Sequence, residues 1–211
     1  MTELNGENKM VAFSTASFLL VLRETIEAAL IVSILLAYLD KTSNIRFKKD
    51  IWIGTIIAVI FSMIGAVVFT QFLGGFEGSA EKLFEGIVMV LAASVLSWMI
   101  IWMMRNGRFI KQELQEKVDL AMSEEKKYAL ISLAFISVFR EGIETILFIG
   151  SISASEDPTG VLLSALIGAL VAVALAIGLF RGVINLDLKK FFNVTSIILI
   201  LFAAGLFAHG I

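Results

Sequence analysis

The sequence predicts an all-α, polytopic membrane protein whose six transmembrane helices form two inverted three-helix repeats. Three observations support this fold class. Hydrophobic residues make up 58% of the 211 residues, and charged residues only 17%, against roughly 25% in an ordinary soluble domain. Six long apolar stretches are separated by short polar loops, and one charged motif occurs once in each half. So few charges cannot cover a water-soluble surface, so the soluble globular and disordered classes are excluded.

Six apolar stretches are long enough to cross the hydrocarbon, which takes about 20 residues. They are 11–39, 51–73, 83–104, 128–150, 159–180 and 191–211. The polar N-terminal residues lack the basic segment of a cleavable signal, so the first stretch is predicted to be a retained helix. This divides the chain into a first repeat (1–104), a connector (105–127) and a second repeat (128–211).

The basic residues predict the orientation in the membrane. The loops after the first, third and fifth stretches hold 13 of the 17 Lys and Arg residues, whereas the opposite side holds only Lys9 and Lys82. Basic loops stay on the cytoplasmic side. We therefore expect a multi-pass protein of the cell membrane, plasma or inner, with its N-terminus outside.

The connector is predicted to contain a short amphipathic helix on the inner membrane surface. Its apolar residues recur at every fourth position: Ile110, Leu114, Val118 and Met122. Glu113 precedes Lys117 by four residues, the spacing of a helical ion pair. Functionally, we interpret this segment as a solvated connector between the two halves.

The motif R-E-x-x-E occurs near the middle of the first and fourth stretches. The first copy runs from Arg23 through Glu24 to Glu27, and the second from Arg140 through Glu141 to Glu144. A central charged residue costs about 2.5–3.5 kcal/mol in a membrane helix, so these six residues are not expected to face lipid. At about 100° per residue, the Arg and both Glu of each copy share one arc of the helix.

The two motif helices are expected to run in opposite directions, because three spans in each half turn the second half upside down. Inverted repeats of this kind are a recurrent design of transporters, with the binding site near the bilayer midplane. Four carboxylates and two guanidiniums carry a formal charge of −2, which a divalent ion brings to zero and a trivalent ion to +1. Carboxylate oxygens suit hard cations.

The motifs therefore predict a cation site formed by carboxylates, with each Arg orienting Glu residues of its own motif. The predicted metal ligands and their supporting residues are Glu24, Glu27, Glu141 and Glu144, with Arg23 and Arg140. The alternative is a buried ion-pair network that only joins the helices. Two inverted copies at the same depth favour the cation site.

The composition excludes several other chemistries. The chain has no Cys and one His, so it has no disulfides, thiolate metal sites or histidine clusters. A net charge of −2 argues against a nucleic-acid partner. We expect no permanently bound cofactor. The Met residues of 83–104 are interpreted as packing or lipid contacts, and Trp98 and Trp102 as residues of a membrane-interface belt.

The paired R-E-x-x-E helices in two three-span halves resemble the high-affinity ferric iron permease family, the oxidase-dependent iron transporters grouped with lead permeases. The resemblance covers nearly the whole chain. It implies import of iron, expected as Fe3+, with Glu24, Glu27, Glu141 and Glu144 carrying the ion. It also implies cooperation with an extracytoplasmic iron oxidase or iron-binding protein. Members usually have a seventh span, whereas this chain ends at Ile211 with its sixth.

A second acidic feature lies before and within the third stretch. Glu77, Glu81 and Glu85 are spaced by four residues and would form one stripe if the helix begins in this loop. One interpretation is a site that gathers cations on their way to the midplane. The other is ordinary compensation of the helix dipole by acidic residues at a helix N-terminus.

Three classes of function fit these features. A metal-ion permease is favoured by the carboxylate site. A proton- or sodium-coupled transporter of another cation or solute would use the same Glu residues for coupling. An intramembrane metal-dependent enzyme fits least well, because the motif helices supply no nucleophile and no His ligand.

Overall fold

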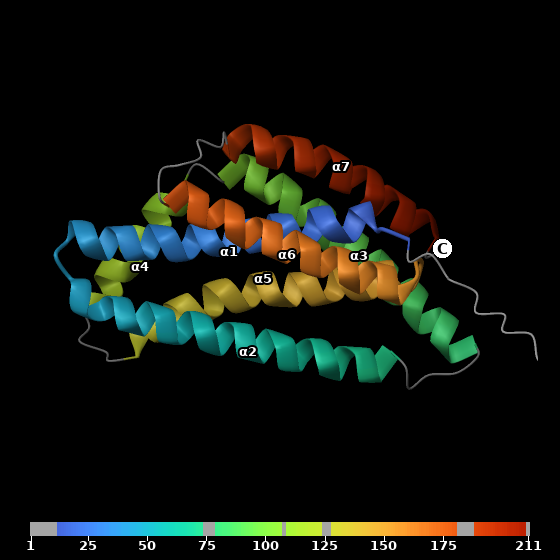
Figure 1. The fold of residues 1–211 in the computed structure, drawn as a ribbon, viewed down its shortest axis with the longest axis horizontal. Coiled ribbons are helices and arrows are strands. Elements are labelled where there is room, and N and C mark those ends of the chain that lie inside the picture. Colours follow the sequence, from blue (N-terminus) through green and yellow to red (C-terminus); the bar gives the residue numbers. More distant parts are fainter. Residues whose placement is uncertain (1–11, 74–78, 107–108, 124–127, 181–187, 210–211) are drawn as a thin grey trace, which may run out of the picture.

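A computed structural model describes residues 12–73, 79–106, 109–123, 128–180 and 188–209, and within these residues it is all-helical, with no strand (Figure 1). Each of the six predicted apolar stretches forms a helix. The elements in chain order are α1 (Thr15–Lys41), a 3-10 turn η1 (Ile45–Phe47), α2 (Lys48–Leu73), α3 (Ser79–Asn106), α4 (Ile110–Ser123), α5 (Ala129–Ser153), α6 (Pro158–Phe180) and α7 (Leu188–His209).

Two helical stretches of the described chain are long and apolar enough to cross a membrane by length and composition alone. They are Ile45–Gln71 and Pro158–Phe180. Gly86–Trp102 and Lys190–Gly205 are shorter apolar helical stretches. Helices α1 and α5 each carry the three charged residues of a motif at mid-length, which makes them less apolar than α2 and α6.

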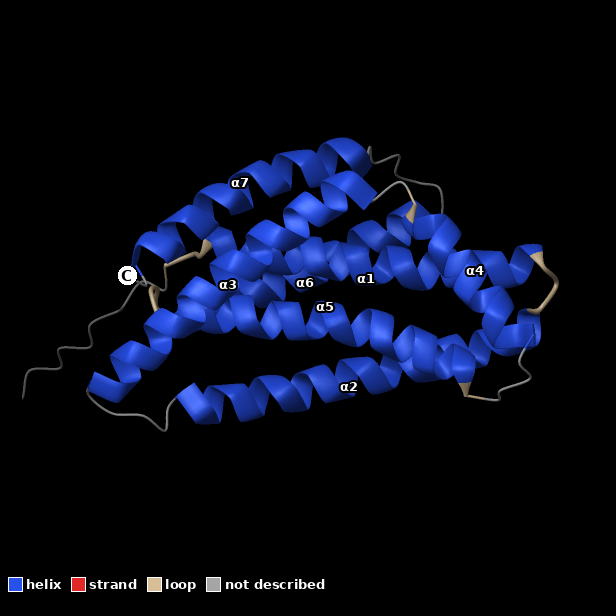
Figure 2. Ribbon diagram, turned by 180° about the vertical axis from the view of Figure 1, so that it is seen from behind, coloured by secondary structure: helices blue, strands red, loops and turns tan. Residues whose placement is uncertain are grey.

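The long helices form an elongated bundle in which successive ones run in alternating directions. Helix α1 begins and α7 ends at the same end of the bundle, whereas α4 lies at the opposite end, where α1 ends and α5 begins (Figures 1 and 2). The motif helices α1 and α5 are therefore antiparallel. Because each motif lies near the middle of its helix, the two motifs lie at a similar depth in the bundle.

The main packing partners are not neighbours in the sequence. Helix α2 packs along α5, and α6 packs along α1. Helix α3 packs against α7, and α1 contacts α5 in the interior. The second helix of each half, α2 or α6, thus packs against the motif helix of the other half.

Glycines let the backbones of these helix pairs approach closely. A methyl group on Gly54 of α2 would meet the carbonyl oxygen of Ile131 on α5, and one on Gly168 of α6 would meet the carbonyl oxygen of Phe18 on α1. On the α5 side, a methyl group on Gly142 would meet the side chain of Ser62. Small residues at such contacts are typical of membrane helix pairs.

Polar caps hold the start of α6 beside the start of α1. The carboxylate of Asp157 accepts a hydrogen bond from the Gly160 N–H at 2.9 Å, and Pro158 occupies the first position of α6, where a missing N–H does no harm. The hydroxyl of Ser17 on α1 donates to the carbonyl of Val161 at 2.7 Å. The Ser17–Val161 bond ties the start of α6 to the start of α1.

The connector forms the predicted helix, α4, whereas its location on the inner membrane surface stays a prediction. Leu114 and Val118 are buried in an apolar cluster with residues of α1 and α5, and the Lys117–Glu113 ion pair measures 2.7 Å. The hydroxyl of Tyr38 on α1 donates to the carboxylate of Asp119 at 2.7 Å. The apolar face of α4 therefore packs against the helix bundle.

Candidate metal site

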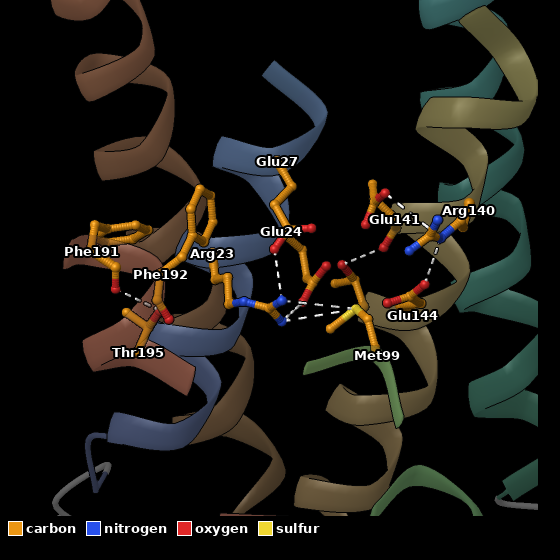
Figure 3. Close-up of polar contacts among 11 residues, drawn as sticks. Arg23, Glu24, Glu27, Met99, Arg140, Glu141, Glu144, Phe191, Phe192 and Thr195 are labelled. Carbon is orange, nitrogen blue, oxygen red and sulfur yellow. Dashed lines mark hydrogen bonds and ion pairs between the residues drawn. The ribbon is translucent and has the colours of Figure 1, made fainter. Parts of the chain in front are cut away.

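The two R-E-x-x-E motifs lie on facing surfaces of α1 and α5, inside the bundle (Figure 3). Their four Glu side chains are buried, as is Arg23. The helical periodicity explains the common orientation, because residues one and four positions after the arginine lie on the same side of the helix. Antiparallel packing then sets the two acidic arcs against each other.

In the α1 motif, one guanidinium holds both carboxylates. Nη1 of Arg23 lies 2.9 Å from Oε1 of Glu24, and Nη2 lies 2.8 Å from Oε1 of Glu27. The Arg23 side chain is 0% exposed. A planar fork with two separated donor nitrogens suits this geometry. The α1 motif is thus a closed, internally paired unit.

The α5 motif is more open. Nε of Arg140 lies 2.9 Å from Oε1 of Glu144 and 3.9 Å from Oε1 of Glu141. The Arg140 side chain is 44% exposed, and its guanidinium carbon lies 5.4 Å from the centre of the Trp102 ring on α3. This is a cation–π distance. The two copies of the motif are therefore alike in sequence but not in environment.

Three of the four predicted ligands come together. One carboxylate oxygen from each of Glu24, Glu141 and Glu144 lies within 4.8 Å of the others. The Oε2 atom of each of these residues is buried without a hydrogen-bond partner among the described residues. Buried carboxylate oxygens without donors are unfavourable. A cation between them would relieve both this desolvation and the repulsion of the negative charges.

Glu27 differs from the other three motif carboxylates. Its Oε1 is ion-paired with Arg23, as is that of Glu24, but Glu27 does not belong to the group of converging oxygens. The arrangement therefore has three converging carboxylates and a fourth beside them, held by an arginine. This difference between Glu24 and Glu27 could not be derived from the motif, in which both lie on one arc.

Met99 is a site residue that the sequence analysis missed. It is buried, and its Sδ lies 3.9 Å from both Nη1 and Nη2 of Arg23. The sequence predicted a packing role. Its spacing from the buried Ala92 and Leu96 places Met99 on the inner face of α3, but no local signal indicates a guanidinium opposite. Trp102, interpreted as an interface residue, likewise lies over Arg140.

The outer acidic stripe remains a prediction. Glu77 lies outside the described residues, and the side chains of Glu81 and Glu85 lie outside them as well, although both residues belong to α3.

Comparisons with known proteins identify the family. The family model described as the Iron permease FTR1 family matches residues 14–211. The ferrous iron permease EfeU of Escherichia coli O6:H1 (strain CFT073) is 37% identical over 198 residues, which cover 92% of this chain and 71% of the relative. The ferrous iron permease EfeU of Yersinia pseudotuberculosis serotype I is 32% identical over 202 residues, 94% of this chain and 71% of the relative. No solved structure matches. The family resemblance expected from the paired motifs is confirmed: the chain belongs to the Iron permease FTR1 family.

Proposed function

We propose that this protein imports iron across the cell membrane through a midplane site between the R-E-x-x-E motifs of α1 and α5. The observation that carries the proposal is the convergence of oxygens from Glu24, Glu141 and Glu144 within 4.8 Å of one another. Membership of a permease family and relatives named as iron permeases support iron as the cargo. The ion is substrate in this proposal, so its binding has to be reversible.

The three converging carboxylates are the proposed direct ligands, and Glu27 is the proposed fourth. Arg23 holds Glu27 in an ion pair beside the site. Arg140 has a single short ion pair, to Glu144, and is partly exposed. Of the two arginines, Arg140 can move away more easily, which would release Glu144 to the arriving cation. Arginines next to ligating carboxylates act here as orienting partners rather than as ligands.

The oxidation state of the cargo has two candidates. Fe3+ follows from the resemblance to ferric permeases and from the hard oxygen ligands. Fe2+ is favoured by the names of the relatives. It is also favoured by the charge of four Glu and two Arg, which a divalent ion neutralises. Iron import is common to both candidates, and a transport assay separates them.

The proposed architecture is two inverted repeats (1–104 and 128–211) joined by the connector (105–127), with six membrane spans and the N-terminus outside. Exchanging α1 with α5, α2 with α6 and α3 with α7 converts the α2–α5 contact into the α6–α1 contact. The same exchange maps the α1–α5 and α3–α7 contacts onto themselves. This pattern is what an inverted pair of three-helix units would produce. The excess of basic residues in one set of loops supports the orientation.

An extracytoplasmic iron oxidase or iron-binding protein is the proposed partner, from the family resemblance alone. The main competing function is a proton- or sodium-coupled transporter of another solute, in which the same carboxylates would bind the coupling ion. That function predicts uptake that depends on an ion gradient and is indifferent to iron.

Uptake of radioactive iron by proteoliposomes tests the proposal. One arm supplies Fe2+ kept reduced by ascorbate, and the other supplies Fe3+ as its citrate complex. We expect saturable uptake in at least one arm, and loss of that uptake in the double variant Glu24→Gln, Glu141→Gln. Uptake no faster than in protein-free liposomes, or an unchanged rate in the double variant, would overturn the proposed function. Imposed sodium and proton gradients test the competing function.

A further inference from the structure

The sulfur of Met99 reaches into the α1 motif from a third helix. Its Sδ lies 3.9 Å from each terminal nitrogen of Arg23 (Figure 3). The same two nitrogens hold Glu24 and Glu27 by ion pairs of 2.9 and 2.8 Å. The guanidinium is fully buried, so water does not compete for these donors. Arg23 is thus held by two carboxylates of its own helix and by one thioether of α3.

A thioether differs from the other acceptors in this cluster. Sulfur is a weak, polarisable acceptor without charge. It occupies N–H groups of Arg23 without adding a further negative charge to a site that already holds four carboxylates. An apolar side chain in its place would remove this acceptor from the buried guanidinium, which is unfavourable for a buried donor. The guanidinium would then turn toward the nearest remaining oxygens.

The nearest candidate for such a turn is Glu24. Its Oε1 already pairs with Nη1 of Arg23, and its Oε2 is buried without a hydrogen-bond partner among the described residues. Glu24 is also one of the three residues whose oxygens converge between α1 and α5. A guanidinium that took both oxygens of Glu24 would withdraw that carboxylate from the cation.

We propose that Met99 is a positioning residue for iron binding: its sulfur holds the guanidinium of Arg23 so that one oxygen of Glu24 stays available to the cation. The inference rests on the proposed function. It assigns to α3 a part in a site whose ligands all come from α1 and α5. Met99 acts through Arg23 and does not itself touch the ion.

The test compares two replacements of Met99 in the reconstituted full chain. Met99→Leu keeps the volume and removes the acceptor, whereas Met99→Gln supplies a neutral oxygen acceptor on a side chain of similar length. We expect Met99→Leu to raise the half-saturating iron concentration about three- to tenfold, the value of one lost hydrogen bond, with nearly unchanged maximal uptake. Met99→Gln should lie closer to the wild type.

A packing role predicts the opposite order. Leu replaces Met in a packed core with little effect, and a buried amide without a partner is worse tolerated than Leu. Wild-type behaviour of Met99→Leu together with a defect of Met99→Gln would therefore overturn the inference. Thermal unfolding without iron gives the same comparison independently of transport: an acceptor role makes Met99→Gln at least as stable as Met99→Leu.

Met89 supplies the matched control. It is a buried methionine of the same helix, and its Sδ lies 3.9 Å from the Ser155 hydroxyl instead of a guanidinium. Met89→Leu should leave the half-saturating concentration unchanged. An equal shift in Met89→Leu and Met99→Leu would contradict the inference while leaving the proposed function intact. Absence of uptake by the wild type would overturn the proposed function, and this inference with it.

Discussion

Glu24 on α1 and Glu141 on α5 are 117 positions apart in the chain, yet their carboxylate oxygens lie within 4.8 Å of each other. Both residues directly follow the arginine of their motif. Their contact therefore joins equivalent positions of two antiparallel helices. Two buried carboxylates this close repel each other unless protons or a cation lie between them, so a cation requirement at this point would come from the pair of motifs and not from either one alone.

The three converging carboxylates should matter more for transport than Glu27. We expect Glu24→Gln, Glu141→Gln or Glu144→Gln each to lower iron uptake at least about tenfold, because each removes a charged ligand from the site. Glu27→Gln should lower uptake less, since Glu27 lies outside the converging group. The measurement is iron uptake by proteoliposomes at equal protein content.

The control for these variants is Glu116→Gln on the exposed face of α4, which should transport like the wild type. Equal loss in Glu27→Gln and Glu24→Gln would show that Glu27 is as much a ligand as Glu24.

The two motif arginines should respond differently to replacement by lysine. Arg23 binds Glu24 and Glu27 through two separate nitrogens, and a single ammonium cannot reproduce this fork. Arg23→Lys should therefore destabilise the protein by about 1–3 kcal/mol, the cost of a buried unsatisfied group. Arg140→Lys should have a smaller effect on stability, because Arg140 is partly exposed and makes one short ion pair.

Unfolding in mixed detergent measures the stability of both variants, and uptake is measured in parallel. Arg105→Lys at the exposed end of α3 is the control. A result in which Arg23→Lys is as stable as Arg105→Lys would show that Arg23 contributes charge without a directional contact.

Close packing of α2 on α5 should depend on Gly142. A methyl group at this position would meet the side chain of Ser62 on α2. We expect Gly142→Ala to destabilise the protein by about 1–3 kcal/mol through overpacking, and Ser62→Gly to recover part of that loss in the double variant. The free energy of unfolding of the four proteins in this double-mutant cycle gives the coupling.

Gly205 in α7 is the matched control, because a methyl group there would meet no atom within 4 Å. Gly205→Ala should be neutral or slightly stabilising, since Ala is the better helix former by about 1 kcal/mol. Additive effects of Gly142→Ala and Ser62→Gly would contradict the predicted contact.

The outer acidic stripe should affect the capture of iron more than its passage. If Glu77 and Glu81 gather cations, their replacement by Gln should raise the half-saturating iron concentration and leave maximal uptake largely intact. This effect should weaken in high salt, because surface charges are screened over about 8 Å at physiological ionic strength. Glu85→Gln, deeper along the helix, should lower maximal uptake as well. Unchanged uptake curves for all three variants at low and high salt would favour helix capping.

The sequence alone determined the helices and the composition of the candidate site. Six apolar stretches of sufficient length became α1, α2, α3, α5, α6 and α7, and a four-residue apolar repeat became α4. These features are local: each depends on residues within a few turns of one helix. The spacing of R-E-x-x-E placed the arginine and both carboxylates of each motif on one arc, and the structure buries all four carboxylates and Arg23.

Only the tertiary structure decided which helices meet and which motif residues converge. Helix α2 packs mainly on α5 and much less on its sequence neighbours α1 and α3. The close contact depends on small residues that face each other from parts of the sequence that are far apart, such as Gly142 and Ser62. Packing of the whole bundle buries Arg23 completely and leaves Arg140 partly exposed, although their motifs read alike. It also brings Met99 to Arg23. Periodicity fixes which face of a helix a residue occupies, but its neighbour across that face depends on the depth and rotation of a second helix, which are set by packing over the whole bundle.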